Sequence, residues 1–346
     1  MKKNKTLFSY MGIGTMAVTL FFGSCAEEQV EETPETFVEA AKETSLTIAP
    51  NPDDYIYIEG TNTDNLIGKT TTAPGPDRGR FNITLKYIVP PTERQIDVFE
   101  AAAARWERII IKDVPSFTGT LPSAFNGLPP VLDNETVDDI IIEVALAPID
   151  GPGGILGQAG PRFVRTSDFL TLSGVMFFDV DDLGFLDQID LFEEVIVHEM
   201  GHVLGVGTLW NAGDRELLQG TLEEPYFAGR KANVFWNAEG GLNELPIENV
   251  GGPGTAFGHW RESVLNNELM TGFLNLGENP LSRITAGSMK DLGYGAASVG
   301  ESYDLPKGTA GVDPNTLTAE GGDAGLNIAE KEVLLQPIGF VSTKKK

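Results

Sequence analysis

The chain has 346 residues, of which 41% are hydrophobic, and its formal net charge is −25. This length and composition suit a globular protein with a sizeable core. So negative a chain would repel a phosphate backbone, which argues against nucleic acid as a partner. The single cysteine, Cys25, excludes an intramolecular disulfide and a zinc site made of thiolates, and only three histidines are present.

The first 24 residues have the layout of a secretory signal peptide. Three lysines lie within the first five residues, an apolar stretch follows, and the small residues Gly23 and Ser24 precede Cys25. The segment Phe22-Gly23-Ser24-Cys25 resembles the lipobox of bacterial lipoproteins, in which the cysteine is lipidated. The resemblance implies a lipid anchor at Cys25 and an exported outer-membrane or cell-surface lipoprotein. The alternative is an ordinary cleaved signal and a secreted soluble protein.

Residues 25–80 are rich in acidic residues, proline, glycine and asparagine, and they predict an acidic tether. A short strand could lie within it at residues 54–58. Ordered structure is expected to begin at residue 81, so that residues 81–346 form one folded domain.

The start of this domain alternates apolar and polar residues over residues 81–89, as a strand does. A helix is predicted next, over residues 92–111, with Thr92 and Gln95 as a capping box. Residues 139–146 are a dense run of β-branched residues that predicts a buried strand.

Four further segments complete the coarse prediction. Residues 174–180 predict another strand, and the glycine-rich residues 151–160 predict a bend between strands. Near the C-terminus, the apolar run at residues 333–335 could close a sheet edge, whereas the basic tail at residues 344–346 is expected to fray.

The strongest signal is the run His-Glu-Met-Gly-His at residues 198–202, within a predicted helix over residues 190–204. His198 and His202 are four residues apart, so they project from one face and can bind one Zn²⁺ through imidazole nitrogen. Glu199 is placed to take a proton from a metal-bound water and return it to the leaving amine. A catalytic zinc needs a third protein ligand, which must come from elsewhere in the chain.

The third ligand does not follow the usual short spacing. The run continues as His-Glu-x-x-His-x-x-Gly, with Gly205 suited to end the helix in a left-handed turn. In metzincins a third histidine usually comes three residues after that glycine, where this chain has Thr208. His259 is the only other histidine, and Glu268 is the rival ligand, because some zinc peptidases use a downstream glutamate.

The segment from residue 258 onward resembles the leishmanolysin family. In that family an insertion separates the glycine from the third histidine, and a histidine-tryptophan pair and a Glu-Leu-Met segment follow. The corresponding runs here are His259-Trp260 and Glu268-Leu269-Met270, and the match extends through residues 282–294.

The resemblance implies that His198, His202 and His259 bind one catalytic Zn²⁺, with Glu199 as the general base. Met270 would be the methionine of the Met-turn, the turn beneath the zinc. The family's latency is attributed to a pro-region cysteine on the zinc, and that switch is not expected here because Cys25 is the sole thiol.

The implied fold is α+β and zincin- or metzincin-like. Residues 81–207 would hold a mixed sheet and helices, including the active-site helix, and residues 208–346 an irregular C-terminal subdomain with the Met-turn. The strand at residues 174–180 is expected to align an extended peptide by strand addition. The long insertion at residues 206–258 is expected to form one wall of the site.

Calcium is a weaker alternative at Asp179, Asp181 and Asp182. Leu183 occupies a position where a calcium loop needs a ligand, and Asp190 replaces the expected bidentate glutamate. A solvated turn is the preferred interpretation.

Together these residues predict a monomeric, zinc-dependent metalloendopeptidase that hydrolyses extracellular protein or peptide substrates through a metal-bound water activated by Glu199. The alternative is a non-catalytic surface adhesin on the same fold. Glu199 argues against the adhesin, because a non-catalytic site has no need of that carboxylate.

Overall fold

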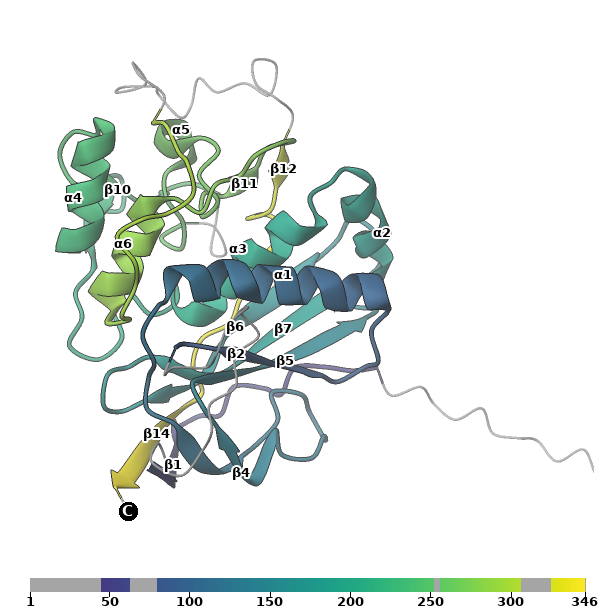
Figure 1. Ribbon diagram of the computed structural model, residues 1–346. Coiled ribbons are helices and arrows are strands. Elements are labelled where there is room, and N and C mark those ends of the chain that lie inside the picture. The colour runs from purple at the N-terminus through teal and green to yellow at the C-terminus, as the bar shows by residue number, and fades with distance from the viewer. Residues whose placement is uncertain (1–44, 63–79, 252–255, 306–324, 346) are drawn as a thin grey trace, which may run out of the picture. The chain divides into compact units, whose positions relative to one another are not determined.

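A nine-stranded mixed sheet is the largest element of the computed structural model, which describes residues 45–62, 80–251, 256–305 and 325–345 (Figure 1). The strand order is β2-β5-β7-β6-β14-β1-β3-β4, and β13 also pairs with β6. The strands are β1 (Ile56–Asn62), β2 (Ile83–Tyr87), β3 (Phe117–Leu121), β4 (Leu132–Val137), β5 (Ile140–Ala147), β6 (Gly157–Arg165), β7 (Thr171–Asp179), β13 (Glu332–Leu334) and β14 (Gly339–Lys345).

The buried strand β5 shows why the sequence forms this sheet. It is parallel to both of its neighbours, β2 and β7. Ile142 and Val144 face the main core, whereas Ile141 and Ala145 face two smaller apolar clusters on the other side. Because both faces are covered, the run is apolar without alternation, as predicted.

Two helices cover one face of the sheet near β6 and β7. Helix α1 (Glu93–Ile109) begins with the predicted capping box of Thr92 and Gln95. It packs on α3 (Phe192–Leu204), which lies against β6 and β7. Trp106 of α1 is fully buried, and its indole Nε1–H donates to the carbonyl of Val197 in α3 at 2.8 Å. Helix α3 is therefore held in place both by apolar contacts with the sheet and by its packing against α1.

The second half of the described chain is less regular. Its helices are α4 (Arg230–Glu239), α5 (Glu262–Leu265) and α6 (Arg283–Leu292), and α2 (Val180–Gln188) precedes α3. Its short strands are β8 (Leu218–Gly220), β9 (Pro225–Phe227), β10 (Leu245–Pro246), β11 (Phe273–Leu274) and β12 (Leu326–Asn327). The predicted α+β fold, a mixed sheet followed by an irregular C-terminal part, is confirmed. None of the described helices is long and apolar enough to cross a membrane.

Ordered structure begins before residue 81, so that part of the prediction is wrong. β1 pairs along its whole length with β14 and reaches β3 at Thr61. Asp54 to Ile58 was expected at most as a short strand inside a tether, but residues 56–60 of β1 alternate between half-buried and exposed, and the strand is part of the sheet. The expectation for residues 1–44 lies outside the described residues.

The predictions for residues 151–160, 333–335 and 344–346 can also be compared with the structure. Residues 157–160 belong to β6 and not to a bend, because Gly157 and Ala159 pair with Phe178 and Met176 of β7. The run at residues 333–335 does close a sheet edge, through β13. The tail is not frayed at Lys344, which pairs with β1 and forms an ion pair with Glu59 at 2.6 Å.

Candidate metal centre

Helix α3 places three functional side chains in the core. His198, Glu199 and His202 each have 0% of their surface exposed. The helix ends at Gly205, whose φ of 117° is left-handed, as predicted, and whose N–H donates to the carbonyls of Gly201 and His202.

His259 reaches the same point from the far side of the insertion. Its Nε2 lies 3.2 Å from Nε2 of His198 and 3.0 Å from Nε2 of His202, which are themselves 3.0 Å apart. The approach depends on Gly207 (φ 74°), where an added Cβ would lie 2.3 Å from the carbonyl oxygen of Gly258. The three histidines of the sequence therefore meet at one point, although His259 lies 57 residues after His202 and 61 residues after His198.

The hydrogen bonds of the two helical histidines show what this cluster can hold. Nδ1 of His198 donates to the carbonyl of Leu269 at 2.7 Å, and Nδ1 of His202 donates to the carbonyl of Val206 at 2.9 Å. These bonds fix the proton on Nδ1 and leave each Nε2 with a lone pair. Lone pairs directed at one another at 3.0 Å repel, so the arrangement fits a bound cation and not a hydrogen bond. Imidazole nitrogen is a usual ligand of zinc.

A fourth group in the cluster, Glu332 of β13, was missed by the sequence analysis. Its carboxylate lies 2.9 Å from Nε2 of His259, 3.4 Å from that of His198 and 3.7 Å from that of His202. All four residues offer ligand atoms within 4.8 Å of one another, so they could together hold a metal. The only signal in the sequence was an acidic residue directly before the apolar run at residues 333–335, which predicts no ligand.

Burial sets the protonation of the site. It lowers the pKa of the His202 imidazole well below its usual value, so that this ring is neutral and available to a metal. Burial, and then the charge of Glu332, raise the pKa of Glu199 well above its usual range. Among the described residues, the only polar partners of the two carboxyl groups are each other and, for Glu332, the imidazoles of the cluster. The pair of acids is therefore stable only with a proton or a cation between the groups.

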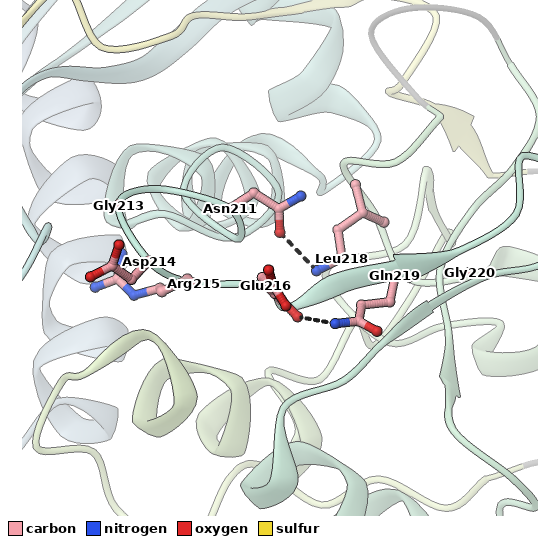
Figure 2. A pocket seen from close by; sticks show the side chains of 8 residues that line it. All are labelled: Asn211, Gly213, Asp214, Arg215, Glu216, Leu218, Gln219 and Gly220. Atoms are coloured by element: carbon pink, nitrogen blue, oxygen red, sulfur yellow. Dashed lines mark hydrogen bonds between the residues drawn. The ribbon is translucent and has the colours of Figure 1, made fainter.

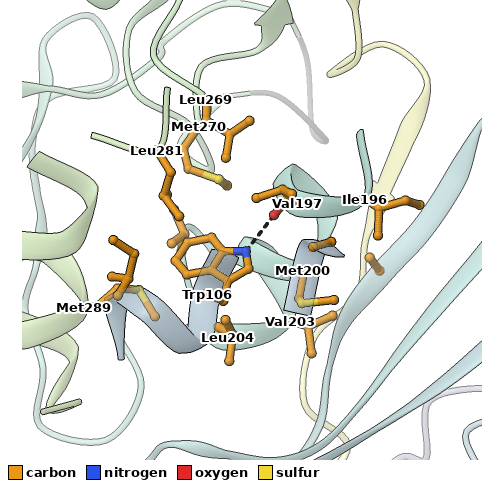
Figure 3. Packing of buried hydrophobic residues seen from close by; sticks show 14 of the residues in the cluster. Trp106, Ile196, Val197, Met200, Val203, Leu204, Leu269, Met270, Leu281 and Met289 are labelled. Atoms are coloured by element: carbon orange, nitrogen blue, oxygen red, sulfur yellow. Dashed lines mark hydrogen bonds between the residues drawn. The ribbon is translucent and has the colours of Figure 1, made fainter. Parts of the chain in front are cut away.

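Met270 packs beside Trp106 and against α3 in the buried core (Figure 3). It is fully buried, and it can approach the helix because residue 201 is glycine. A Cβ on Gly201 would lie 2.7 Å from Sδ of Met270 and 2.9 Å from Cζ2 of Trp106. The backbone beside Met270 also orients a histidine, since the carbonyl of Leu269 accepts from His198.

We expect Gly201→Ala to destabilise the protein by about 1–3 kcal/mol, because the added methyl group overpacks the contact between α3, Met270 and Trp106. Urea unfolding of the metal-free protein measures this change. Gly184→Ala is the matched control, since Gly184 lies in α2 with nothing within 4 Å of the added Cβ. It should stabilise by about 0.5–1 kcal/mol through helix propensity. Equal effects of the two variants would refute the packing argument.

Glu268, the rival third ligand, and Thr208, at the position of the usual third histidine, both make other contacts. The carboxylate of Glu268 accepts hydrogen bonds from Met270 N–H at 2.7 Å and from Ser282 Oγ and Thr285 Oγ1 at 2.6 Å, and it is not part of the cluster. Thr208 donates to the backbone carbonyl of His202 at 2.6 Å. Both residues are structural: Glu268 orders the Met270 turn, and Thr208 satisfies the end of α3.

The calcium alternative is not supported by the surroundings of Asp179. Its carboxylate caps α2 through Asp181 N–H and accepts from the N–H groups of Ile149, Asp150 and Gly151 at 2.8–3.0 Å. A cation site would need oxygen ligands where these donors lie.

A surface recess lies within the insertion that was expected to form a wall of the site (Figure 2). Arg215 at this recess donates to the carbonyls of Phe169, Asp168 and Leu292, so its charge is used to tie loops together. No residue of the histidine cluster lines it. The lining residues are Asn211, Gly213, Asp214, Arg215, Glu216, Leu218, Gln219 and Gly220.

The half-buried Glu262, at the start of α5, gives a prediction for pH. Burial raises the pKa of Glu262 to about 8, against a hydrogen bond with Thr271, and the charge of Glu248 adds to the rise. An unfolded glutamate titrates near pH ~4.3. Between these values the folded protein binds the extra proton, so this group makes stability fall as the pH rises from about 4 to 8.

Glu262→Gln should remove this contribution. Between pH 5 and pH 8, we expect the free energy of unfolding of the metal-free variant to fall by about 1–2 kcal/mol less than that of the wild type. This figure takes about 1.4 kcal/mol per pKa unit and is reduced because the side chain is partly exposed. Urea unfolding at both pH values measures the difference. An unchanged pH dependence would show that Glu262 ionises normally in the folded protein.

A buried helix that carries His-Glu-x-x-His, completed by a distant third histidine over a methionine turn in an α+β fold, defines a metallopeptidase site. The family model of leishmanolysin matches residues 112–310, which is more than half of the 346-residue chain. The chain belongs to the leishmanolysin family of metallopeptidases. The matched region contains the three histidines and Met270 but ends before Glu332. No curated protein matches the chain.

Proposed function

We propose that the protein is a zinc-dependent endopeptidase that cleaves extracellular proteins or peptides. The observation that carries this proposal is the convergence of three buried Nε2 atoms beside a buried glutamate. That glutamate, Glu199, lies on α3 together with His198 and His202. His198, His202 and His259 would hold the metal. When bound, zinc supplies a Lewis acid that polarises the scissile carbonyl and lowers the pKa of water.

The chain's own residues account for proton transfer and for the ordering of the ligands. Glu199 directly follows the ligand His198, and burial raises its pKa, so that it can take up a proton and hold it for the leaving amine. The carbonyls of Leu269 and Val206 hold the imidazoles of His198 and His202 in orientation. Preorganisation of this kind spares the site from reordering during the reaction.

The strand that would align a substrate is β6, which corrects the expectation for residues 174–180. Residues 174–179 lie in β7, which is hydrogen-bonded on both sides, to β5 and to β6, and Val180 begins α2. A peptide cannot be added to an interior strand. The other edge of β6 pairs with β13 and β14, so near the cluster an extended peptide could pair with β6 only in place of β13.

Chelator-sensitive cleavage of casein or of a peptide library tests the proposed activity. We expect hydrolysis that is lost with 1,10-phenanthroline and restored by zinc. A zinc-loaded, folded protein that cleaves no peptide, even when the site is opened as described below, would favour a non-catalytic adhesin.

We also propose that the protein is lipidated at Cys25 and held at the cell surface. Cys25→Ser should abolish incorporation of labelled palmitate and release the protein from the membrane fraction, because the sole thiol would be lost. Ser24→Ala is the control and should keep the label. Membrane retention of unlabelled Cys25→Ser protein would contradict a lipid anchor.

A further inference from the structure

Residues 326–335, here called the strap, cross the metal centre from one side to the other. At one end β12 pairs with β11, which follows the Met270 turn. Figure 1 shows β12 beside β11, above α3. The N–H of Ala329 donates to the carbonyl of Gly272 at 3.2 Å, and Ile328 is fully buried. The strap is thus fastened to the C-terminal part of the site.

At its other end the strap adds a strand to β6. β13 runs parallel to β6, with Glu332 opposite Gly157. The N–H of Leu335 donates to the carbonyl of Ala159 at 2.7 Å. The fit is close, since a Cβ on Gly160 would lie 2.1 Å from the carbonyl oxygen of Leu335. The strap therefore covers the edge of β6 that an extended peptide would need.

Between these two attachments the strap directs Glu332 into the histidine cluster. Its buried carboxylate faces all three Nε2 atoms, and because Nδ1 carries the proton in His198 and His202, these two imidazoles offer it no donor. A buried carboxylate without donors is costly unless a cation lies beside it. Three imidazoles and a carboxylate complete the four ligands that close a zinc site, whereas a catalytic site keeps one position open.

The strap is attached less firmly than its neighbours. β13 has three residues in register with β6, whereas β14 has seven in register with β1. The side chains of Glu330 and Val333 are exposed. β12 and β14 can stay in place while the residues between them move away.

We propose that the strap is an intramolecular inhibitor, in which Glu332 closes the metal coordination and β13 occupies the substrate edge of β6. This proposal rests on the proposed peptidase function for its biological meaning, but the closure itself is a property of the metal site. It assigns latency to the C-terminal segment, in a chain whose single thiol is Cys25.

The test uses the full-length protein loaded with Co²⁺, whose visible spectrum reports the ligands. Acetohydroxamate, a small chelating probe, should leave the wild-type spectrum unchanged because no position is open. In Glu332→Ala it should shift the spectrum, and casein cleavage should rise about tenfold or more, which corresponds to closure favoured by at least about 1.4 kcal/mol. Glu330→Ala removes an exposed carboxylate of the same strap and should behave as the wild type.

Gly160→Ala provides a second route that keeps Glu332. Its added methyl group collides with the carbonyl of Leu335 and should displace β13, so the probe should also shift this spectrum. Circular dichroism establishes that each variant is folded. The strap is refuted if the wild type binds the probe as tightly as Glu332→Ala, or if both folded variants exclude it. Loss of Co²⁺ binding in Glu332→Ala would also refute it, because Glu332 would then be a required ligand.

The same measurements separate this proposal from the proposed function. If the probe gains access in both variants but neither cleaves peptides, the strap closes the metal site and the peptidase assignment fails. If the wild type cleaves peptides and its spectrum responds to the probe, the peptidase assignment stands and the strap fails.

Discussion

Glu199→Gln is expected to lower peptide hydrolysis by about 10²–10⁴-fold, the range for loss of a general acid-base group, while the protein keeps its zinc. Glu199 is fully buried next to the ligand His198, yet it is not a member of the cluster of possible ligands. The amide is nearly isosteric with the carboxylate but cannot take up the proton. Turnover should therefore fall far more than metal content or stability.

The comparison is best made in the Glu332→Ala background, so that closure of the site does not mask the effect. Glu193→Gln is the matched control, because Glu193 lies in the first turn of α3 and its side chain is 43% exposed. It should retain the activity of its background. Undiminished casein cleavage by the Glu199 variant would remove this residue from the mechanism, whatever the fate of the strap.

His259→Ala is expected to weaken zinc binding by more than about 100-fold, since even loss of a group that only supports a ligand costs 10–100-fold. Nε2 of His259 lies 3.0–3.2 Å from the other two Nε2 atoms and 2.9 Å from the Glu332 carboxylate. In the Glu332→Ala background its loss leaves two imidazoles, too few for a stable site, whereas in the wild type Glu332 could still serve as a third ligand. Competition with a fluorescent zinc chelator measures the affinity directly.

Thr208→Ala is the control for this change, because Thr208 stands where the short metzincin motif has its third histidine. Its hydroxyl donates to a backbone carbonyl, so we expect a loss of about 1 kcal/mol in stability and unchanged zinc affinity. Wild-type zinc affinity in the His259 variant would show that the metal site does not need the distant histidine.

Local patterns in the sequence were sufficient to predict the active-site helix, the start of α1 and the strand β5. The helix that carries His198 and His202, its end at Gly205 and the capping box at Thr92 depend on contacts within a few residues, so spacing and residue type predict them. The strand β5 was predicted for the same reason, because an apolar run of that length has to be buried. The pairing of β1 with β14 was not predicted, since it joins residues that are 283 positions apart, such as Ile56 and Gly339.

The role of the strand at residues 174–180 depended on the same long-range information. Its sequence predicts a strand but not its neighbours, and the structure pairs this strand with β5 on one side and β6 on the other. The strand that could align a peptide, β6, contains glycine-rich residues that resemble a bend when they are considered alone.

The sequence by itself determined the helix with its two histidines and its glutamate, because these residues act within two turns of one helix. By elimination and by family resemblance it also named His259, as no other histidine remained. Only the tertiary structure decided that Glu268 is held by Ser282 and Thr285, and that Glu332 faces the three imidazoles. A carboxylate has no spacing that reveals its partner. Its position is set by how β13 pairs with β6, an interaction between distant segments.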